Sequence, residues 1–393
     1  MSDGWQRDAC AIVGIGETEY SKNSGVSVTA LAAEATLAAL ADAGLDPADV
    51  DGIVRNDMDL VSCAALADAI GARDVTYFGE AGPGGSGPCA MVAQAVGAIA
   101  SGQADTVVVF RSLNGRSGTR FGLSAEVQRT VGGQESFLEF FAPYGLLAPG
   151  QFFALLTREY MNRFGLTSEQ LGHVALAARR HANNNPRAQM HARKMTLDDY
   201  LNSRMLSSPL RLFDYCLETD GAAAVVVTAA DRARDLRQRP ALIRAAAMAT
   251  GPRPQPGMMY PVLMRDDPLS MPSRYCAETL YRRAGLGPQD IDSAQLYDCF
   301  TITALLQLED YGFCAAGEAG AFAAAGELEI GGALPFNTSG GHLSEGYIHG
   351  MNHVVEGVRQ LRGDSCNQVE GASVSLVTSA PPPATSALIL VAA

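Results

Sequence analysis

The sequence predicts an α/β fold made of two similar halves. Strand-like and helix-like runs alternate along most of the chain, which is typical of a sheet covered by helices on both faces. The segment at residues 43–51 recurs at residues 284–292, and each copy follows an Ala-rich helix and precedes a short strand. Because the period of this repeat is long, we interpret it as an internal duplication and not as a solenoid.

The composition excludes several classes of protein. With 393 residues, of which 47% are hydrophobic and 18% charged, the chain can bury one large core or two. The net charge of −13 disfavours a nucleic-acid partner, and no apolar run is long enough to span a membrane. The eight cysteines include no Cys-x-x-Cys pair, which favours the reduced cytoplasm over a disulfide framework or a zinc ribbon.

In the first half, residues 1–239, glycines and capping residues mark the element boundaries. Gly14 and Gly16 end the first strand, and Ser27 caps the helix that follows it. The predicted elements are a strand at 11–16, helices at 28–43 and about 60–70, a strand near 75–77, a helix at 91–99, strands at 106–110, 209–214 and 220–227, and a helix at 228–235.

A region at about 111–206 interrupts this pattern and is predicted to be a loop region inserted in the first half. Helix-like runs lie within it at 151–164 and 168–183. It also contains an aromatic group, which consists of Phe137, Phe140, Phe141 and Tyr144. This group is either a hydrophobic wall for a bulky substrate or the core of a helical subdomain.

The second half, residues 240–393, repeats the alternation after a junction at Arg239 and Pro240. Its predicted elements are a strand at 241–247, a helix at 272–284, a strand at 294–297, a helix ending at 308, a loop or loose helix at 315–325, a helix at 354–361, and strands at 373–378 and 387–391.

Two glycine-rich turns, one in each half, are the strongest candidates for a functional site. Each precedes a helix-like run, so its backbone N–H groups and the helix N-terminus can stabilise a negatively charged oxygen. The titratable Tyr347 follows the second turn closely. The first turn contains Gly84, Gly85, Ser86 and Gly87, and the second contains Asn337, Ser339, Gly340 and Gly341.

These motifs resemble the thiolase superfamily, in the branch of the lipid-transfer (sterol-carrier-x) thiolases. The likeness rests on the run Asp220-Gly221-Ala222-Ala223-Ala224, on the second turn and on the doubled architecture, and it covers nearly the whole chain. The resemblance implies a five-layered αβαβα thiolase fold, a homodimer and a coenzyme A thioester as substrate.

The chain departs from the thiolase pattern at the catalytic positions. Gly84 or Gly85 stands where a thiolase has its nucleophilic cysteine, and Cys89 lies about one turn further into the helix. Tyr297 and Tyr347 replace the two catalytic histidines, and the second cysteine is absent around residues 377–383. These departures argue against acyl transfer through an acyl-cysteine.

The paired tyrosines are similar to those of the steroid side-chain aldolases of the lipid-transfer type. That resemblance implies retro-aldol cleavage of a 17-hydroxy steroid CoA thioester to a 17-ketosteroid and propionyl-CoA, with Tyr297 and Tyr347 as the acid/base pair. The two turns would form the oxyanion hole for the thioester. Asp298 either orients a tyrosine or its water, or makes a structural hydrogen bond.

Other chemistries and functions remain as alternatives. A Schiff-base route needs a lysine, but Lys22 and Lys194 lie outside the turns. His349 and His353 can share a helix face near His342, but no further ligand stands at a recognisable spacing, so we predict no metal. The rival functions are a thiolase-type acyltransferase that uses another cysteine, and a non-catalytic subunit that binds lipid or acyl-CoA. The cysteines considered for that acyltransferase are Cys89 and Cys299.

The resemblance also implies a partner protein of the DUF35 class, which has a zinc ribbon and an OB-like domain. Because this chain has no zinc-ribbon spacing, such a module would come from a second chain, in an α₂β₂ complex. We expect the partner to order residues 111–150, and we expect zinc in the partner alone and no cofactor in this chain.

Overall fold

The computed structural model describes residues 4–118, 120, 141–252, 265–382 and 384–393, and these form one main sheet of nine strands. The strands lie in the order β3 (Tyr77–Ala81), β2 (Gly52–Asn56), β4 (Thr106–Asn114), β7 (Asp220–Ala229), β1 (Cys10–Glu17), β8 (Ala241–Ala249), β11 (Thr385–Ala392), β10 (Val374–Thr378) and β9 (Ser293–Gln295).

The strand pairings of the first five strands recur in the last four. β2 pairs in parallel with β3 and β4, and β4, β7 and β1 then pair antiparallel. In the same way β9 pairs in parallel with β10, which is followed by antiparallel β11 and β8. A parallel bridge from Ala294 to Phe336 takes the place of β3. The two sets join where β1 pairs with β8 over two residues.

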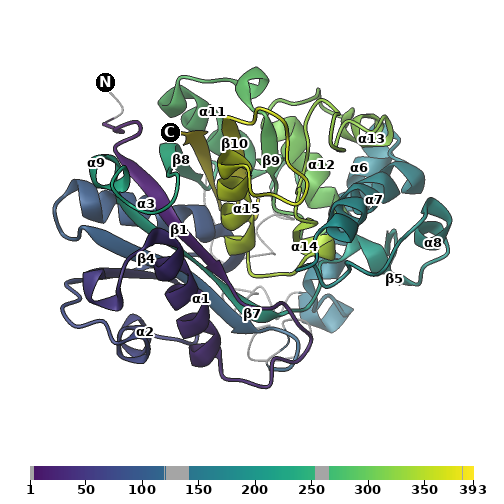
Figure 1. Cartoon of the computed structure of the whole chain (residues 1–393). Helices are drawn as coiled ribbons and strands as arrows, with labels where there is room; N and C mark the ends of the chain where they lie inside the picture. Colours follow the sequence, from purple (N-terminus) through teal and green to yellow (C-terminus); the bar gives the residue numbers. More distant parts are fainter. Residues whose placement is uncertain (1–3, 119, 121–140, 253–264, 383) are drawn as a thin grey trace.

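Helices cover the outer faces of the two sets of strands and also form a layer between the sets (Figure 1). α1 and α2 pack on one side of the first set of strands, and α11 packs on the far side of the second set. α3 and α15 contact each other and strands of both sets, so they form a central layer. The helices in these three layers are α1 (Val28–Ala43), α2 (Cys63–Ile70), α3 (Pro88–Ala100), α15 (Met351–Arg362), α11 (Pro272–Ala284) and α12 (Thr301–Asp310).

Buried side chains alternate between these layers along each strand, as the period of two requires. On β4, Val107 and Val109 belong to the central core, whereas Val108 and Phe110 face the core under α1. A third core lies between the second set of strands and α11 and α12. The layers follow the order αβαβα that the resemblance to thiolases implied.

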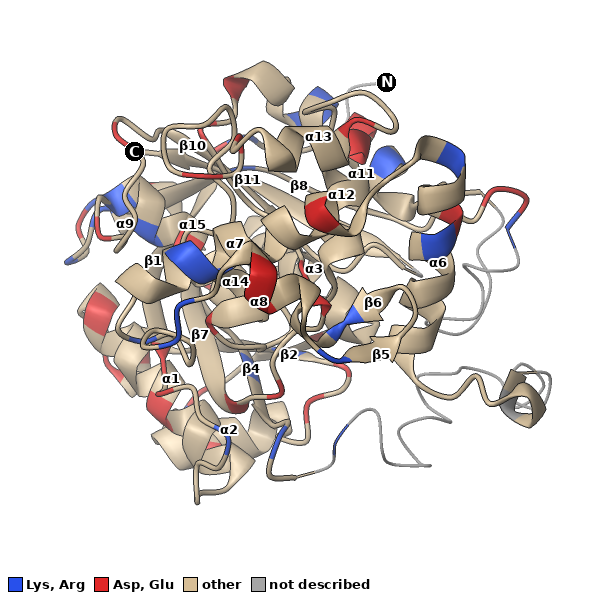
Figure 2. Cartoon of the chain, turned by 90° about the vertical axis from the view of Figure 1, so that its right-hand side faces the viewer, with Lys and Arg blue, Asp and Glu red and all other residues tan. Residues whose placement is uncertain are grey.

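Residues 115–219, between β4 and β7, include α6 (Pro149–Phe164), α7 (Ser168–Asn184), α8 (Leu197–Leu201) and the small sheet of β5 (Met205–Ser207) and β6 (Leu210–Arg211). α7 packs against α12 and against two shorter helices of the second half, α13 (Ala319–Ala324) and α14 (Gly341–Ser344), on the face shown in Figure 2. Phe141 meets Phe152 edge to face at 6.1 Å, whereas Tyr144 is 86% exposed. Phe137 and Phe140 lie outside the described residues.

Three predicted elements are present with bounds that differ from the prediction. The helix predicted at 228–235 is only α9 (Ala230–Ala233), because β7 continues through its pairing of Thr228 and Ala229 with β1. The strand predicted at 209–214 shortens to β6, since the Asp214 carboxylate accepts a hydrogen bond from the Arg211 amide and closes a turn. The strand predicted near 75–77 is β3, which begins at the end of that range.

Within the described residues, no helix is long and apolar enough to cross a membrane.

Candidate active site

The two central helices bring both glycine-rich turns to the same end of the molecule. The first turn leads directly into α3, and the second leads into α14 and then α15. A cavity of about 1180 Å³ opens beside them. Of the predicted site residues, Gly85, Tyr297 and Tyr347 line this cavity.

Tyr297 and Tyr347 form a hydrogen-bonded pair at the cavity wall. Their hydroxyl oxygens are 2.7 Å apart, and Tyr297 is 2% exposed whereas Tyr347 is half-buried. Burial raises the pKa of both phenols well above the usual value. Their mutual hydrogen bond raises the pKa of Tyr297 further but lowers that of Tyr347, which Arg111 also lowers. Either hydroxyl can donate in this hydrogen bond, and burial opposes ionisation of both phenols.

The first turn is packed against the hydroxyl of Tyr297. A Cβ atom built on Gly85 would overlap that hydroxyl, so an alanine or a cysteine there would have to displace it. Its neighbours are bonded to the protein: the Gly84 amide donates to Asp57, the Ser86 hydroxyl donates to the Ala384 carbonyl, and the Gly87 amide donates to the Gly84 carbonyl. Tyr297 thus fills the space that a nucleophilic cysteine at residue 85 would need.

The second turn holds carboxylates of the protein. The amides of His342 and Leu343, at the start of α14, donate to the Asp298 carboxylate at 2.8 and 3.3 Å, and Asp298 is fully buried. The Ser339 hydroxyl donates to Glu345 at 2.7 Å, and the side chain of Asn337 bonds both backbone groups of Leu296. Residues 337–341 are buried and do not line the cavity.

Asp298, His342 and His353 form a buried cluster of the composition that metal sites use. His342 Nδ1 and His353 Nε2 each lie 3.4 Å from the same Asp298 oxygen. However, the two imidazole rings are stacked at 4.0 Å with an angle of 16°, so their in-plane lone pairs run side by side and do not converge on one ion. The residues in this arrangement do not fit a metal.

The two stacked rings instead support the tyrosines. The His342 ring meets the Tyr297 ring edge to face at 4.6 Å and the Tyr347 ring at 4.9 Å. Burial and the neighbouring His353 and His349 lower the pKa of His342 well below its usual value, so its ring is neutral. Asp298 therefore lies one ring behind the tyrosine pair and makes no hydrogen bond to either hydroxyl in the described residues.

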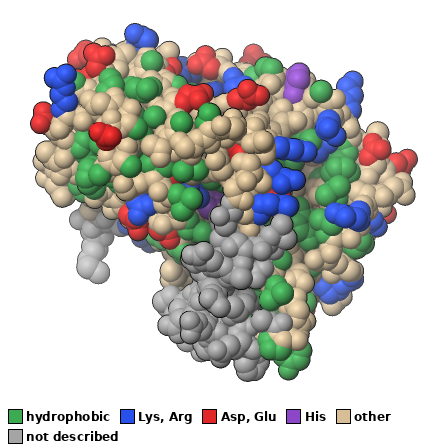
Figure 3. Space-filling view, turned by 90° about the horizontal axis from the view of Figure 1, so that it is seen from below, with side chains coloured by type: hydrophobic (Ala, Val, Ile, Leu, Met, Phe, Trp, Pro, Cys, Tyr) green, Lys and Arg blue, Asp and Glu red, His purple; other side chains and the backbone are tan. Residues whose placement is uncertain are grey.

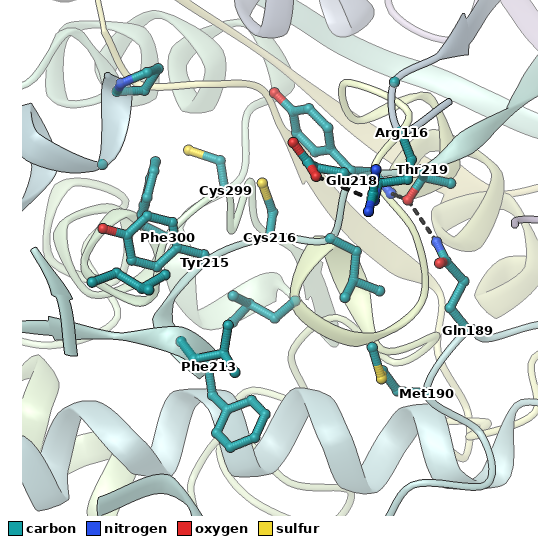
Figure 4. A pocket seen from close by; sticks show the side chains of 18 of the residues that line it. Arg116, Gln189, Met190, Phe213, Tyr215, Cys216, Glu218, Thr219, Cys299 and Phe300 are labelled. Atoms are coloured by element: carbon teal, nitrogen blue, oxygen red, sulfur yellow. Dashed lines mark hydrogen bonds and ion pairs between the residues drawn. The ribbon is translucent and has the colours of Figure 1, made fainter. Parts of the chain in front are cut away.

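The cavity has one aromatic and one polar wall. Figure 4 shows Phe213, Tyr215 and Phe300 on one side, and Arg116, Glu218 and Gln189 on the other. On the face seen in Figure 3, Lys and Arg side chains gather beside hydrophobic ones. The basic residues that line the cavity include both lysines of the chain; they are Lys22, Arg116, Arg120, Arg179, Arg193, Lys194 and Arg204. Such a cavity suits a ligand with a large apolar part and a negatively charged part.

The cysteines near the site are poor nucleophiles. Cys89 is buried in the helix away from the cavity, its thiol donates to the Val377 carbonyl, and burial raises its pKa to about 12. Cys299 and Cys216 do line the cavity, but burial raises the pKa of each thiol well above its usual value. A protonated thiol reacts slowly, so these residues do not replace the missing nucleophile.

Three groups at this site were missed or misjudged from the sequence. Arg111 and Cys216 carry no motif that would mark them. His349 was considered only as a metal ligand, although it lines the cavity next to Tyr347. Its position two residues after Tyr347 was the one available signal.

Comparison with known proteins places these features in context. Residues 259–392 match the family model of the thiolase C-terminal domain-like proteins. The chain is 47% identical to 17-hydroxy-3-oxo-4-pregnene-20-carboxyl-CoA lyase of Mycobacterium tuberculosis, over 97% of this chain and 98% of that protein. It is 46% identical to the steroid side-chain-cleaving aldolase of Thermomonospora curvata, over 97% of each. The solved structure of the Ltp2-ChsH2(DUF35) aldolase superposes with a TM-score of 0.92 at 45% identity, covering 98% of both chains.

Proposed function

The chain belongs to the thiolase superfamily, among its steroid side-chain-cleaving aldolases, and from that premise we propose that it cleaves a 17-hydroxy steroid CoA thioester into a 17-ketosteroid and propionyl-CoA. The observation that carries this proposal is the tyrosine pair at the cavity, with Tyr297 standing in the space of the thiolase nucleophile. That arrangement favours acid/base chemistry over acyl transfer.

The reaction uses the two hydroxyls in sequence. Tyr347 accepts the proton of the 17-hydroxyl group while its own proton passes across the 2.7 Å hydrogen bond to Tyr297, so neither phenol has to ionise beforehand. The bond from that carbon to the carbon next to the thioester then breaks, its electron pair forms the thioester enolate, and the hydroxyl becomes the ketone. Tyr297 delivers its proton to the enolate carbon. The nearby charge of Arg111, which lowers the pKa of Tyr347, supports the role of Tyr347 as the group that accepts the proton.

The enolate oxygen needs hydrogen-bond donors while the bond breaks. Of the residues first considered, Gly85 borders the cavity, and we propose its backbone N–H as one donor. The amides at the start of α14 already bind Asp298, which supports a structural role for the second turn and for Asp298.

The direct test is a product assay with a 17-hydroxy steroid CoA thioester that carries a three-carbon side chain. We expect mass spectrometry to show equal amounts of the 17-ketosteroid and propionyl-CoA. Release of acetyl-CoA or acyl exchange with free CoA would indicate the acyltransferase alternative, and binding without turnover in the complete complex would indicate the non-catalytic one.

We also propose a partner of the DUF35 class in an α₂β₂ complex around a homodimer. The solved aldolase with a DUF35 partner supports the first part. The position of β3 at the sheet edge, with Phe78 54% exposed, supports pairing between two copies. Light scattering should show that the purified chain alone is a dimer, and the product assay should show that this dimer is nearly inactive. Addition of the partner should restore cleavage. Full activity of the isolated dimer would contradict the need for a partner.

We place the reaction in the cytoplasm. All eight cysteines are free thiols in the structure, which suits a reducing compartment.

A further inference from the structure

The backbone of Tyr297 is held by side chains from two other elements. β9 ends at Gln295, and the pair of Gln295 and Val377 is the last one between β9 and β10. Two residues further on, the Tyr297 amide donates to the Thr378 hydroxyl at 3.0 Å, and the Tyr297 carbonyl accepts from Gln307 Nε2 at 2.8 Å. The position of Tyr297 therefore depends on the identity of these two side chains.

The two side chains also bind each other, which closes a ring of hydrogen bonds. The Thr378 hydroxyl donates to Gln307 Oε1 at 2.5 Å. Besides the Tyr297 carbonyl, Gln307 Nε2 binds the Thr303 carbonyl at 2.7 Å. A side-chain amide has one acceptor oxygen and two donor hydrogens, so Gln307 uses its oxygen and both hydrogens here. A residue that lacks either the donor or the acceptor would break the ring.

Gln307 supports the site from behind the cavity wall. It is fully buried in α12, Thr378 is fully buried at the end of β10, and neither lines the cavity that the described residues form. Tyr297 does line it. A buried amide costs free energy unless its polar atoms are paired, whereas an apolar residue of similar size fills the same volume without that cost. The glutamine is therefore explained by the hydrogen bonds that it gives to the Tyr297 backbone.

The hydroxyl of Tyr297 needs an accurate position. It lies 2.7 Å from the Tyr347 hydroxyl, with which it exchanges a proton, and a Cβ atom on Gly85 would come within 2.1 Å of it. A tyrosine side chain moves only by rotation about its torsions, so the backbone sets where the hydroxyl can lie. A misplacement of about 1 Å can cost on the order of 10²-fold in rate. Restraints on the Tyr297 backbone thus act on proton transfer.

We propose that Gln307 is a positioning residue, which holds the Tyr297 backbone so that its hydroxyl stays within proton-transfer distance of Tyr347. Gln307 does not touch the substrate and acts through Tyr297, and Thr378 completes the restraint. This inference rests on the proposed function and adds to it a residue outside the cavity. It predicts a loss of rate without a loss of substrate binding.

Kinetics in the complete complex test the role. Gln307→Met keeps the size of the side chain but removes both hydrogen-bonding groups, so it should lower kcat roughly tenfold or more with KM changed little. Leu308→Ala, at the next buried position of α12, is the matched control. It should lower the thermal midpoint at least as much and keep the kcat of the folded protein. A wild-type kcat in Gln307→Met, or an equal loss of kcat in both variants, would overturn the inference and leave the proposed function standing. An inactive wild type would overturn the function itself.

A second variant gives a readout that a packing role would not change. In Gln307→Glu, a protonated carboxyl can donate to the Tyr297 carbonyl and accept from Thr378, whereas a carboxylate can only accept. Burial raises the pKa of such a carboxyl, so the variant should exceed Gln307→Met at low pH and lose kcat relative to wild type as the pH rises. The ratio of rates is measured between about pH 5 and 9, where the raised pKa should lie. A Gln307→Glu rate that stays at the level of Gln307→Met throughout would overturn the inference.

Discussion

The two glycine-rich turns have the same sequence character and stand in equivalent places, but they serve different groups. The first turn faces the cavity through Gly85, and the phenol of Tyr297 fills the space above it. The second turn is closed over the Asp298 carboxylate by two amides of α14. A turn that can stabilise an anion therefore needs no ligand if the protein supplies a carboxylate. The comparison predicts that changes near the first turn affect catalysis, whereas changes at the second affect folding.

Loss of either tyrosine hydroxyl should have the largest effect. Tyr347→Phe and Tyr297→Phe should each reduce turnover by on the order of 10²-fold or more, because proton transfer is lost at the cavity. Tyr281→Phe removes a hydroxyl that bonds the Tyr311 carbonyl far from the pair and should keep its rate. The measurement is steady-state cleavage in the complete complex, and a near wild-type rate in either site variant would remove that residue from the mechanism.

A single methyl group at the first turn should also impair catalysis. In Gly85→Ala the new Cβ displaces the Tyr297 hydroxyl, so the rate should fall roughly tenfold or more, since a small misplacement of a reacting group is costly. The thermal midpoint should fall less than in the second-turn variant described next. An unchanged rate would show that Tyr297 can move without consequence.

The corresponding change at the second turn should reduce stability. Gly341 has a φ of 58°, and a Cβ there would overlap the Asp298 carboxylate, so Gly341→Ala should lower the free energy of unfolding by about 3 kcal/mol. Gly97→Ala, on an exposed helix position with open space, is the control for both glycine variants and should not destabilise. Chemical denaturation measures the difference.

The second turn should also make stability depend on pH. Burial raises the pKa of Glu345, which accepts from Ser339, to about 8, above the ordinary 4.5. Because the folded state keeps this proton more tightly, its stabilisation is fully present below pH 4.5 and is lost as the pH rises towards 8. Between pH 5.5 and 8, the free energy of unfolding of Glu345→Gln should fall by about 1–2 kcal/mol less than that of the wild type. Parallel denaturation curves for both proteins across that range would contradict the assignment.

The buried thiol of the first helix should matter least. Cys89→Ala should keep turnover within about twofold and cost about 1 kcal/mol of stability, because the thiol is a packing group. Cys299→Ala should likewise keep substantial activity. Loss of activity in a folded Cys89→Ala protein would revive the acyl-enzyme alternative.

Much of the fold was predictable because local patterns and the duplication agree. Ser27 caps α1 through the amide of Ala30, as the sequence indicated, and the repeat gave both sets of strands. The predictions that failed concern features that tertiary contacts determine. Pairing with β1 extends β7 into a predicted helix, and the direction of the α14 amides towards Asp298 cannot be seen in a Ser-Gly-Gly motif. The contact between Arg111 and His349 joins residues 238 positions apart, and no local pattern encodes it.

The overlap between Gly85 and the Tyr297 hydroxyl also limits how such an enzyme can arise. An ancestor with a cysteine at residue 85 could not gain this tyrosine first, because the two side chains compete for one volume. A change of cysteine to glycine alone removes the nucleophile and leaves no acid to replace it. In this geometry one chain cannot hold both a cysteine nucleophile at residue 85 and the Tyr297 hydroxyl in its present position.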